Sequence, residues 1–256
     1  MNDQNAPTRR LAYGVDPQRP ERYSLRQARY DALAGDIDAL AGVAAREGRR
    51  LSVLDIGAGA AATPRHLRAR PNFRAIDIDG TDIERRKNLD ESLYRRLFIG
   101  DLTKGYPELA SGAYDVVVCE QVLEHLHELK IPMETIGRLV RPDGRAFVGV
   151  PIFIPPLHLA RRHLVPHLDR LMGRRRRRDH VQAFTLAQFR AALVANSKLE
   201  FVEARGFRIV SGGLLRPLEE FRGWWAFNRW LGARLPGACI EVQVVLQKPA
   251  VTVAAA

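Results

Sequence analysis

The stretch from residue 51 to residue 80, LSVLDIGAGAAATPRHLRARPNFRAIDIDG, constrains the fold of this chain most. Its apolar run 51–54 is too short for a helix and has the aliphatic composition of a buried parallel strand. Gly57 and Gly59 follow, and glycine permits both a sharp turn and a close approach of ligand to backbone. A helix is predicted to open next, with Thr63 as its N-cap and Pro64 in its first turn. The stretch therefore predicts a strand, a ligand-binding turn and a helix.

A second strand is predicted over residues 73–78, ending in the acids Asp77 and Asp79. An acid about 20 residues after a glycine turn lies where its carboxylate can accept hydrogen bonds from both hydroxyls of a ribose. We therefore expect Asp77 to bind the ribose of a cofactor.

The glycine turn alone leaves the cofactor open. The spacing of Gly57, Gly59 and Ala62 fits a dinucleotide fingerprint as well as a nucleoside one, so an NAD(P)-linked oxidoreductase is one interpretation. Asp55 favours another, because a carboxylate beside the turn repels a pyrophosphate but suits a cationic sulfonium or an α-amino group. A turn that binds nothing is the third alternative.

These residues resemble motif I of the class I S-adenosylmethionine (SAM) dependent methyltransferases, usually D/E-x-G-x-G-x-G. Ala61 stands where the third glycine of that motif falls. The resemblance implies that SAM is the cofactor and that Asp55, Gly57 and Gly59 bind it.

A third strand is predicted over 94–99, followed by Gly100-Asp101-Leu102. The methyltransferase resemblance places this element beside adenine, where the Asp101 carboxylate would accept from the exocyclic amine and the Leu102 amide would donate to a ring nitrogen. Asp101 could instead cap a turn, since Gly105 and Pro107 follow.

The segment 114–126, YDVVVCEQVLEHL, is predicted to be a fourth strand that runs into a helix ending at Leu139. It resembles the FDVV and LEH segment of the ubiquinone-pathway type O-methyltransferases. That resemblance places Glu120 and Gln121 near the cofactor and His125 at the methyl-transfer cleft. The alternative role of His125 is to bond a neighbouring loop.

No metal site is expected at this turn. In the ubiquinone-pathway enzymes a divalent cation has been placed at an E-x-x-E-H pattern, but the first position here is Gln121. Affinity for hard cations rises with the number of carboxylates, so a neutral amide weakens such a site.

The order of these elements predicts an α/β fold, a doubly wound and mostly parallel sheet with its ligand over the carboxyl ends of the strands. A fifth strand is expected over 145–150, a last helix over 186–195, and final strands over 206–210 and 240–246. The resemblance implies seven strands, one of them antiparallel. Four acids are predicted at carboxyl ends of strands: Asp55, Asp77, Asp101 and Glu120.

Length and composition fit a single α/β domain, because 256 residues that are 46% hydrophobic can bury a full core, and the resemblance implies that it is a methyltransferase domain over 21–250. An amphipathic helix is predicted over 23–44. Residues 1–20 carry three prolines among polar residues and are expected to form a mobile arm. Residues 152–179 are expected to form an insertion after the fifth strand.

Two cysteines cannot form a disulfide framework, so a reducing cytoplasm is the expected compartment. No signal peptide and no membrane-spanning segment are expected, since the sequence has no run of 18 apolar residues. The net charge of +11 suits an anionic partner, and a non-catalytic basic RNA-binding module is an alternative function. Nucleic acid is the less favoured partner, because Cys119-Glu120-Gln121-Val122 lacks the usual signatures of base methylation.

The insertion holds much of that charge. Residues 152–178 contain eight arginines against the single acid Asp169, a net charge of +7, next to several leucines. Such a segment can be a solvated charge run, a basic lid, or a contact with an anionic membrane. The segment 221–232, FRGWWAFNRWLG, holds all three tryptophans and can add an anchor, line an acceptor pocket or form a dimer contact.

The predicted function is SAM-dependent methyl transfer to an oxygen or carbon of a small, lipid- or sugar-linked acceptor. The reaction is an in-line displacement that depends mostly on proximity and orientation. His125 or His180 is expected to take the acceptor proton, because imidazole titrates near neutral pH. His180 opens a segment, HVQAFT, that resembles the H-x-x-x-F-T/S lead into the last helix of the family.

Overall fold

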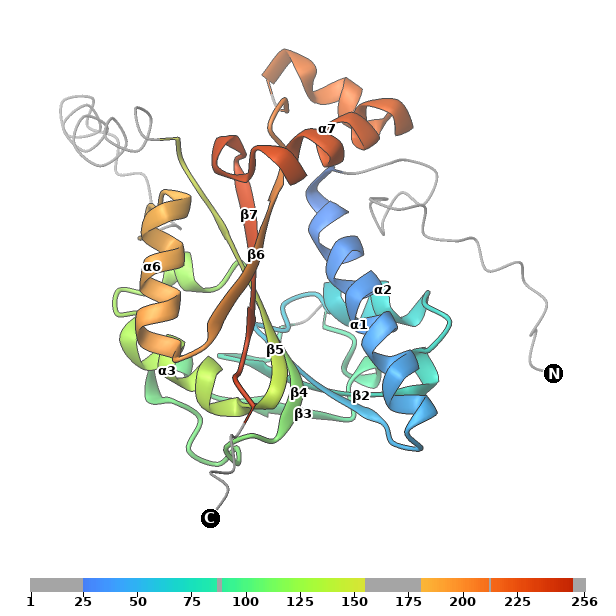
Figure 1. Ribbon diagram of the computed structural model, residues 1–256, viewed down its shortest axis with the longest axis vertical. Helices are drawn as coiled ribbons and strands as arrows, with labels where there is room; N and C mark the ends of the chain where they lie inside the picture. The colour runs from blue at the N-terminus through green and yellow to red at the C-terminus, as the bar shows by residue number, and fades with distance from the viewer. Residues whose placement is uncertain (1–24, 87–88, 155–180, 212, 251–256) are drawn as a thin grey trace.

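The computed structural model describes residues 25–86, 89–154, 181–211 and 213–250. The expected N-terminal arm and nearly all of the expected insertion lie outside these described residues. The described part of the chain forms one sheet flanked by helices, drawn in Figure 1.

Seven strands of the described residues form the sheet, in the order β3-β2-β1-β4-β5-β7-β6. Adjacent strands from β3 to β5 pair in parallel, while β7 is antiparallel to both β5 and β6. This confirms the doubly wound, mostly parallel sheet. The strands are β1 (Leu51–Ile56), β2 (Ile76–Asp82), β3 (Arg96–Ile99), β4 (Tyr114–Glu120), β5 (Val140–Pro151), β6 (Glu200–Phe207) and β7 (Glu241–Gln247).

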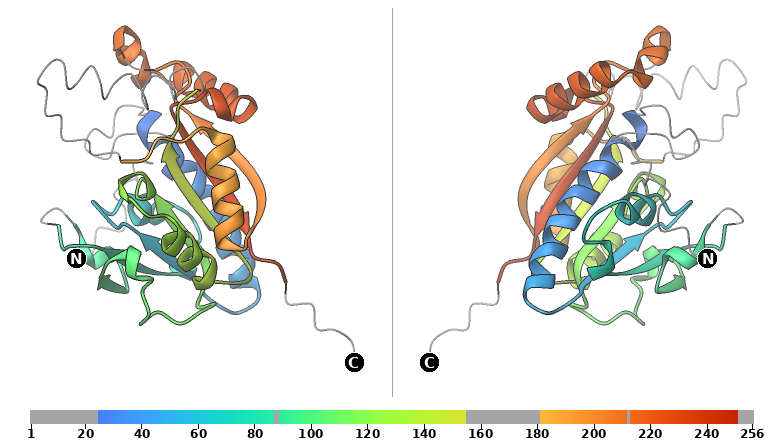
Figure 2. Two further views of the ribbon diagram at one scale, coloured as in Figure 1. Left: turned by 90° about the vertical axis from the view of Figure 1, so that its left-hand side faces the viewer. Right: turned by 90° about the vertical axis from the view of Figure 1, so that its right-hand side faces the viewer.

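Helices cover both faces of the sheet, as the turned views of Figure 2 show. Helices α1 (Ala28–Arg46) and α2 (Ala62–Arg68) lie together on one face, and α3 (Lys130–Leu139) and α6 (Leu186–Ser197) on the other. The core divides accordingly into two apolar clusters, one beneath each helix pair. Helix α7 (Arg222–Arg234) packs mainly on β6. Short 3-10 turns join these elements: η1 (Leu25–Gln27), η2 (Phe73–Ala75), η3 (Glu91–Leu93), η4 (Leu102–Lys104), η5 (Leu123–His125), η7 (Gly213–Glu220) and η8 (Pro236–Ala238).

Two helices illustrate how local sequence sets these elements. In α1 the side chains of Leu33, Ile37, Ala41 and Ala44 are fully buried at helical spacing, which confirms the expected amphipathic helix. Helix α6 starts at a capping box in which the Thr185 hydroxyl and the Gln188 side chain each bond the other residue's backbone amide.

Several predicted boundaries are wrong. Strand β2 does not end at Ile78 but continues to Asp82, and β6 starts at Glu200 rather than at 206. Helix α2 is preceded by Ala61, so Thr63 lies inside the helix and is not its N-cap. The predicted helix after β4 is broken, because only the 3-10 turn η5 follows the strand before α3 begins at Lys130.

None of the described helices has the length and apolar character needed to cross a membrane.

Candidate active site

The turn between β1 and α2 is held by the end of β2. The backbone amides of Gly57 and Ala58 both donate to the carbonyl of Thr81, at 2.8 and 2.9 Å. The amide of Gly59 donates to the carboxylate of Asp82 at 2.8 Å. Gly57 and Gly59 have φ angles of +79° and +54°, a left-handed backbone that glycine adopts without strain.

The same turn contacts the loop after β4. A Cβ on Gly57 would lie 2.3 Å from Cγ2 of Val122, so only a glycine fits between the two loops. Ala61 has a φ of +59° although it carries a Cβ, and its side chain is fully buried. Ala61, which stands where motif I usually has its third glycine, therefore has the left-handed backbone conformation that glycine favours.

Asp55 is buried beneath the turn, where both of its carboxylate oxygens accept hydrogen bonds from protein hydroxyls. Thr63 of α2 donates at 2.9 Å and Tyr94, just before β3, donates at 2.7 Å. Burial raises the pKa of Asp55 to about 6, while the two hydroxyls favour its ionised form. Asp55 thus ties α2 and β3 to β1, and its direct contact with a cofactor stays a prediction.

Asp82 is a site residue that the sequence interpretation missed. It is the last residue of β2, it is buried, and its two oxygens accept from the amides of Gly59 and Ile83. Its place at the carboxyl end of β2, beside the glycine turn, is the one expected of a ribose-binding acid.

Asp77 does not reach this edge of the sheet. It pairs in register with Ser52 near the start of β1, and its carboxylate forms ion pairs with Arg50 and Arg95. Asp82 lies five positions further along the strand, a distance of roughly 16 Å. The expected place of Asp77 at the carboxyl end of its strand is therefore wrong, because β2 runs further than expected.

Asp79 also has a structural role. Its side chain is fully buried and accepts from Arg95, Arg96 and the Tyr114 hydroxyl. Burial alone would raise the pKa of Asp79, but the two guanidiniums hold it below its ordinary value.

The loop after β3 lies next to Asp82, because the amide of Gly100 donates to the Asp82 carbonyl at 2.9 Å. Asp101 caps η4, with one carboxylate oxygen accepting from the amide and hydroxyl of Thr103. These bonds lower the pKa of Asp101 and keep it ionised. Leu102 buries its side chain in the core. The structure thus brings the predicted adenine-binding residues to the edge of the sheet that holds the glycine turn.

Glu120, at the end of β4, is held by protein groups. Gln243 of β7 donates to its carboxylate at 2.7 Å, and the Arg29 guanidinium of α1 lies 3.2 Å away. Arg29 also pairs with Glu241. Burial raises the pKa of Glu120 to about 8 against the opposing charge of Arg29. We assign this carboxylate to fixing α1 on the sheet, and its predicted contact with a cofactor stays a prediction.

Gln121 turns the chain away from β4 with a φ of +58°, and its amide donates to the Gly149 carbonyl. Its side-chain nitrogen is buried and has no hydrogen-bond acceptor among the described residues. A buried donor without an acceptor costs about 1–3 kcal/mol, so it indicates a place where a ligand can complete the bonding.

His125 ends the 3-10 turn η5, and its imidazole is 44% exposed. Its Nε2 lies 3.9 Å from a carboxylate oxygen of Glu124. The Glu124 side chain is completely buried, and neither of its oxygens has a hydrogen-bond partner in the described part of the chain. Burial raises the pKa of Glu124 above its ordinary value. The turn thus places an accessible imidazole beside a buried acid.

His180 lies outside the described residues, but the chain that follows it is placed. The amides of Val181 and Gln182 both donate to the Glu124 carbonyl, at 2.8 and 3.0 Å. The residue after His180 is therefore anchored one position from His125.

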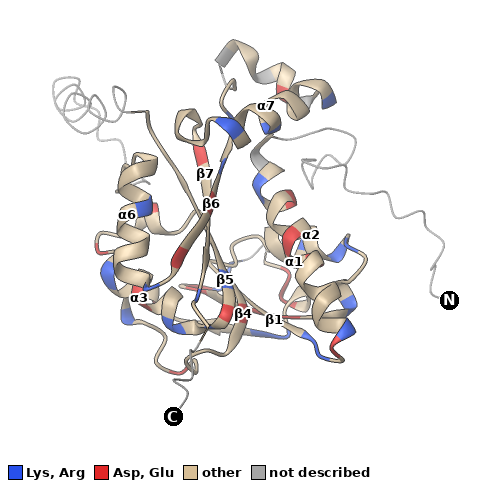
Figure 3. Cartoon of the chain, viewed as in Figure 1, with Lys and Arg blue, Asp and Glu red and all other residues tan. Residues whose placement is uncertain are grey.

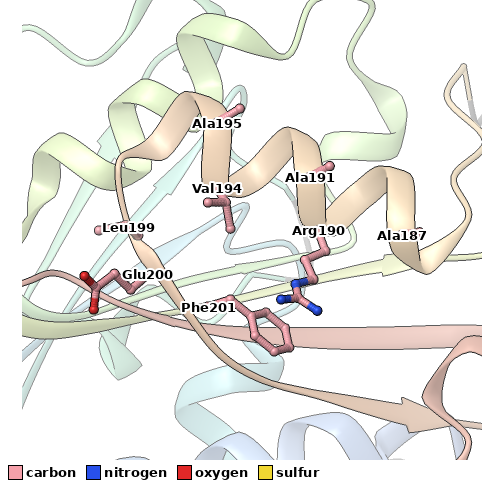
Figure 4. Close-up of a pocket in the computed structure, with 8 residues that line it drawn as sticks. All are labelled: Ala187, Arg190, Ala191, Val194, Ala195, Leu199, Glu200 and Phe201. Carbon is pink, nitrogen blue, oxygen red and sulfur yellow. The ribbon is translucent and has the colours of Figure 1, made fainter.

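The cavities found among the described residues do not lie at the glycine turn but beside α6 and β6. An apolar groove of about 710 Å³ runs between α6 and β6, with Arg190 stacked 3.9 Å over the ring of Phe201 (Figure 4). No residue of the glycine turn, of β2 or of the loop after β4 lines it. Within the described ranges no three His, Cys, Asp or Glu side chains come together as a metal site.

Comparison with known proteins decides which cofactor the protein uses. The model of a methyltransferase domain family matches residues 24–210, which is most of the chain. The chain belongs to this methyltransferase family. It is a SAM-dependent methyltransferase, and the oxidoreductase and non-catalytic alternatives are set aside.

A curated relative is named ubiquinone biosynthesis O-methyltransferase, from Cupriavidus pinatubonensis. It is 28% identical to this methyltransferase over 189 residues, which cover 67% of each protein.

Solved structures share the fold. A structure described as that of a sarcosine dimethylglycine methyltransferase from Galdieria sulphuraria has a TM-score of 0.56 at 19% identity and covers 88% of both chains. The cyclase SpnF has a TM-score of 0.50 at 16% identity, covering 83% of this chain and 81% of its own. The cyclase's name indicates that this fold also serves other chemistry.

The residues at this edge fit SAM. Two glycines with positive φ leave the backbone free of side chains, and the buried donor of Gln121 has no partner among the described residues. The carboxylate of Asp82 bonds the turn at Gly59 and that of Asp55 lies beneath it, and negative charge at these positions suits the sulfonium and α-amino charges of SAM.

Proposed function

We propose that this methyltransferase methylates a hydroxyl oxygen of a small acceptor, with a carbon acceptor as the second candidate. The observation that supports this most is the accessible imidazole of His125, which lies beside the buried carboxyl group of Glu124 in the turn after β4. A hydroxyl must lose its proton as it is methylated, and an imidazole accepts protons near neutral pH. The similarity to a protein named as an O-methyltransferase supports the same acceptor atom.

We assign the cofactor contacts to the carboxyl edge of the sheet. Asp82 would accept from the ribose hydroxyls, Asp101 from the adenine amine, and the Leu102 amide would donate to a ring nitrogen. The amides of the turn at Gly57 and Gly59 and the side chain of Gln121 would face the remaining polar groups of SAM. The assignments of Asp82, Asp101 and Leu102 are supported by two hydrogen bonds at this edge. Asp82 accepts from the amide of Gly59 in the glycine turn and from the amide of Gly100, which precedes Asp101.

SAM supplies an electrophilic methyl carbon when bound. The protein orients the acceptor in line with it, which accounts for most of the rate enhancement. His125 takes the acceptor proton, and the buried carboxyl group of Glu124 lies 3.9 Å from the imidazolium that forms. His180 is the second candidate for the base, since the adjoining Val181 is bonded to the Glu124 carbonyl.

The acceptor is proposed to be linked to a lipid or a sugar. Residues 152–178 carry a net charge of +7, and their entry at Ile152 adjoins the last residue of β5, at the same carboxyl edge of the sheet. Such a segment suits the anionic surface of a membrane, where each basic side chain contributes about 1 kcal/mol of binding free energy.

An acceptor panel tests the acceptor atom. The full chain is incubated with methyl-labelled SAM and a set of dihydroxybenzenes, with and without an isoprenoid tail, alongside aminobenzene and thiophenol analogues of matched shape. We expect label on oxygen, with faster turnover for the tailed acceptor. Label found only on nitrogen or sulfur would exclude the proposal. A product that forms without label would show that this chain uses the fold for other chemistry.

A further inference from the structure

We propose that α7 is a membrane-binding helix that inserts its outer aromatic face into the interface of a bilayer containing anionic lipid. This goes beyond the acceptor chemistry and beyond the contact proposed for residues 152–178. It rests on described side chains of α7, on their exposure and on their charge.

The inner face of α7 is fixed to the protein. Trp225 packs against a small cluster of Ala28, Ala32 and Phe207. The buried side chain of Asn228 accepts from the amide of Val210 at 3.0 Å. These contacts account for one side of the helix only.

The outer face carries aromatic side chains that no described part of the chain covers. Phe227 is 42% exposed and Trp230 is 51% exposed, and Phe221, just before the helix, is 62% exposed. The ring centroids of Phe227 and Trp230 are 6.2 Å apart, and Phe227 continues the row at 5.7 Å to Trp224, whose indole N–H is anchored to the Val210 carbonyl at 3.1 Å. Isolated exposed apolar residues are ordinary, but a continuous aromatic row marks an interaction surface.

The charges of α7 favour a lipid surface over a protein partner. The helix contains no acid, and of its three arginines Arg222 and Arg234 belong to this face, while Arg229 stacks inward over the rings of Phe207 and Trp225. The Arg234 guanidinium lies 4.4 Å over the ring of Trp230, so a cation stands at the end of the row. Figure 3 shows α7 with basic residues at the end of the molecule beyond the sheet. Aromatic rings flanked by arginines are the composition of helices that lie in the interface of anionic bilayers.

The position of α7 links this surface to the site. Helix α7 packs on β6, which ends at Phe207. Phe207 is in register with Glu241 at the start of β7, and Glu241 is in register with Pro151 at the end of β5. Strands β1 to β5 also end at this edge, so insertion of α7 turns the glycine turn and the loop after β4 toward the lipid surface. A lipid-linked acceptor would reach His125 from that side.

Tryptophan fluorescence tests α7 selectively, because Trp224, Trp225 and Trp230 are the only tryptophans of the chain and all lie in this helix. The full chain is mixed with vesicles of phosphatidylcholine and phosphatidylglycerol whose acyl chains carry bromine, a quencher that acts only at short range. We expect quenching with these vesicles and much less with pure phosphatidylcholine vesicles.

Two variants make the test decisive. Phe227→Ser with Trp230→Ser should lower vesicle co-sedimentation by about tenfold or more. The matched control is Val194→Ser with Val202→Ser, which removes two exposed apolar side chains from α6 and β6 and should bind vesicles like wild type. All proteins are compared only where their melting temperatures agree within a few degrees.

Three results would overturn the proposal. In the first, wild type binds vesicles without tryptophan quenching, and changing Arg174–Arg178 to Ser abolishes the binding. This would assign membrane contact to the arginine run alone. In the second, wild type does not bind vesicles but forms concentration-dependent dimers, and the Phe227→Ser/Trp230→Ser variant stays monomeric. This would show that the aromatic row binds a second copy of the chain. No vesicle binding by wild type would also exclude it. None of these results bears on whether labelled methyl groups reach a hydroxyl, so the proposed function stands or falls separately.

Discussion

Gly57 and Val122 lie in contact across the site, so that a Cβ on Gly57 would come within 2.3 Å of Cγ2 of Val122. The contact couples the turn after β1 to the loop after β4, which carries Gln121 and His125. The two loops that we assign to the cofactor and to proton transfer are therefore packed as one unit.

Gly57→Ala should destabilise the protein by about 2–4 kcal/mol, because the new methyl group overlaps Val122 and the φ of +79° strains an alanine. Adding Val122→Ala should restore only part of this, since it removes the overlap and leaves the backbone strain. Chemical denaturation of the two single variants and the double variant measures the coupling. Strictly additive effects would show that the loops are not in contact.

The pKa of Asp55 predicts a pH dependence of stability. Its folded value, about 6, lies above its ordinary 3.8, so the folded state holds this proton more tightly than the unfolded state. The resulting stabilisation is complete below about pH 4 and is lost as the pH rises through 6, a change of about 3 kcal/mol. Asp55→Asn removes this titration. The free energy of unfolding of wild type minus that of Asp55→Asn should therefore fall between pH 4 and pH 7, and a constant or rising difference would contradict the buried placement of Asp55.

His125→Gln should lower turnover by about 10²-fold and leave the affinity for S-adenosylhomocysteine nearly unchanged. Glu124→Gln should lower turnover less, and it should move the pH–rate profile because it removes the buried titratable acid beside the imidazole. The matched control is His127→Gln, the same change two residues further on and outside the turn, which should leave turnover and affinity unchanged. Full turnover by His125→Gln, with the fold intact, would transfer the role of base to His180.

The sequence was sufficient to predict the glycine turn, the sheet and the cofactor class, since strand, turn and helix signals there are local. It did not predict that Asp82 ends the second strand, because that strand was expected to stop at Ile78, before Gly80. In the structure Gly80 lies inside β2, where a Cβ would come within 2.8 Å of the Tyr94 ring. The glycine makes room for the side chain that bonds Asp55, a tertiary relation that no local pattern contains.

Two further features of the structure could not be predicted from the sequence for the same reason. Glu120 follows a buried strand as a site acid would, but its partners Arg29 and Gln243 come from opposite ends of the chain. Helix α7 was not predicted, because glycines and aromatics lower its helix propensity. Its anchoring contacts, Trp225 on Phe207 and Asn228 on Val210, come from tertiary packing.

Calorimetric titration with S-adenosylhomocysteine tests most directly the claim that the cofactor binds at the carboxyl edge of the sheet and that Asp82 holds its ribose. Wild type should bind, and NAD and NADP should give no heat of binding. Asp82→Ala should weaken binding by about tenfold or more for each lost bond to its charged carboxylate. Asp77→Ala, a matched change at the other end of the same strand, should bind like wild type. Loss of affinity in Asp77→Ala together with full affinity in Asp82→Ala would contradict the account.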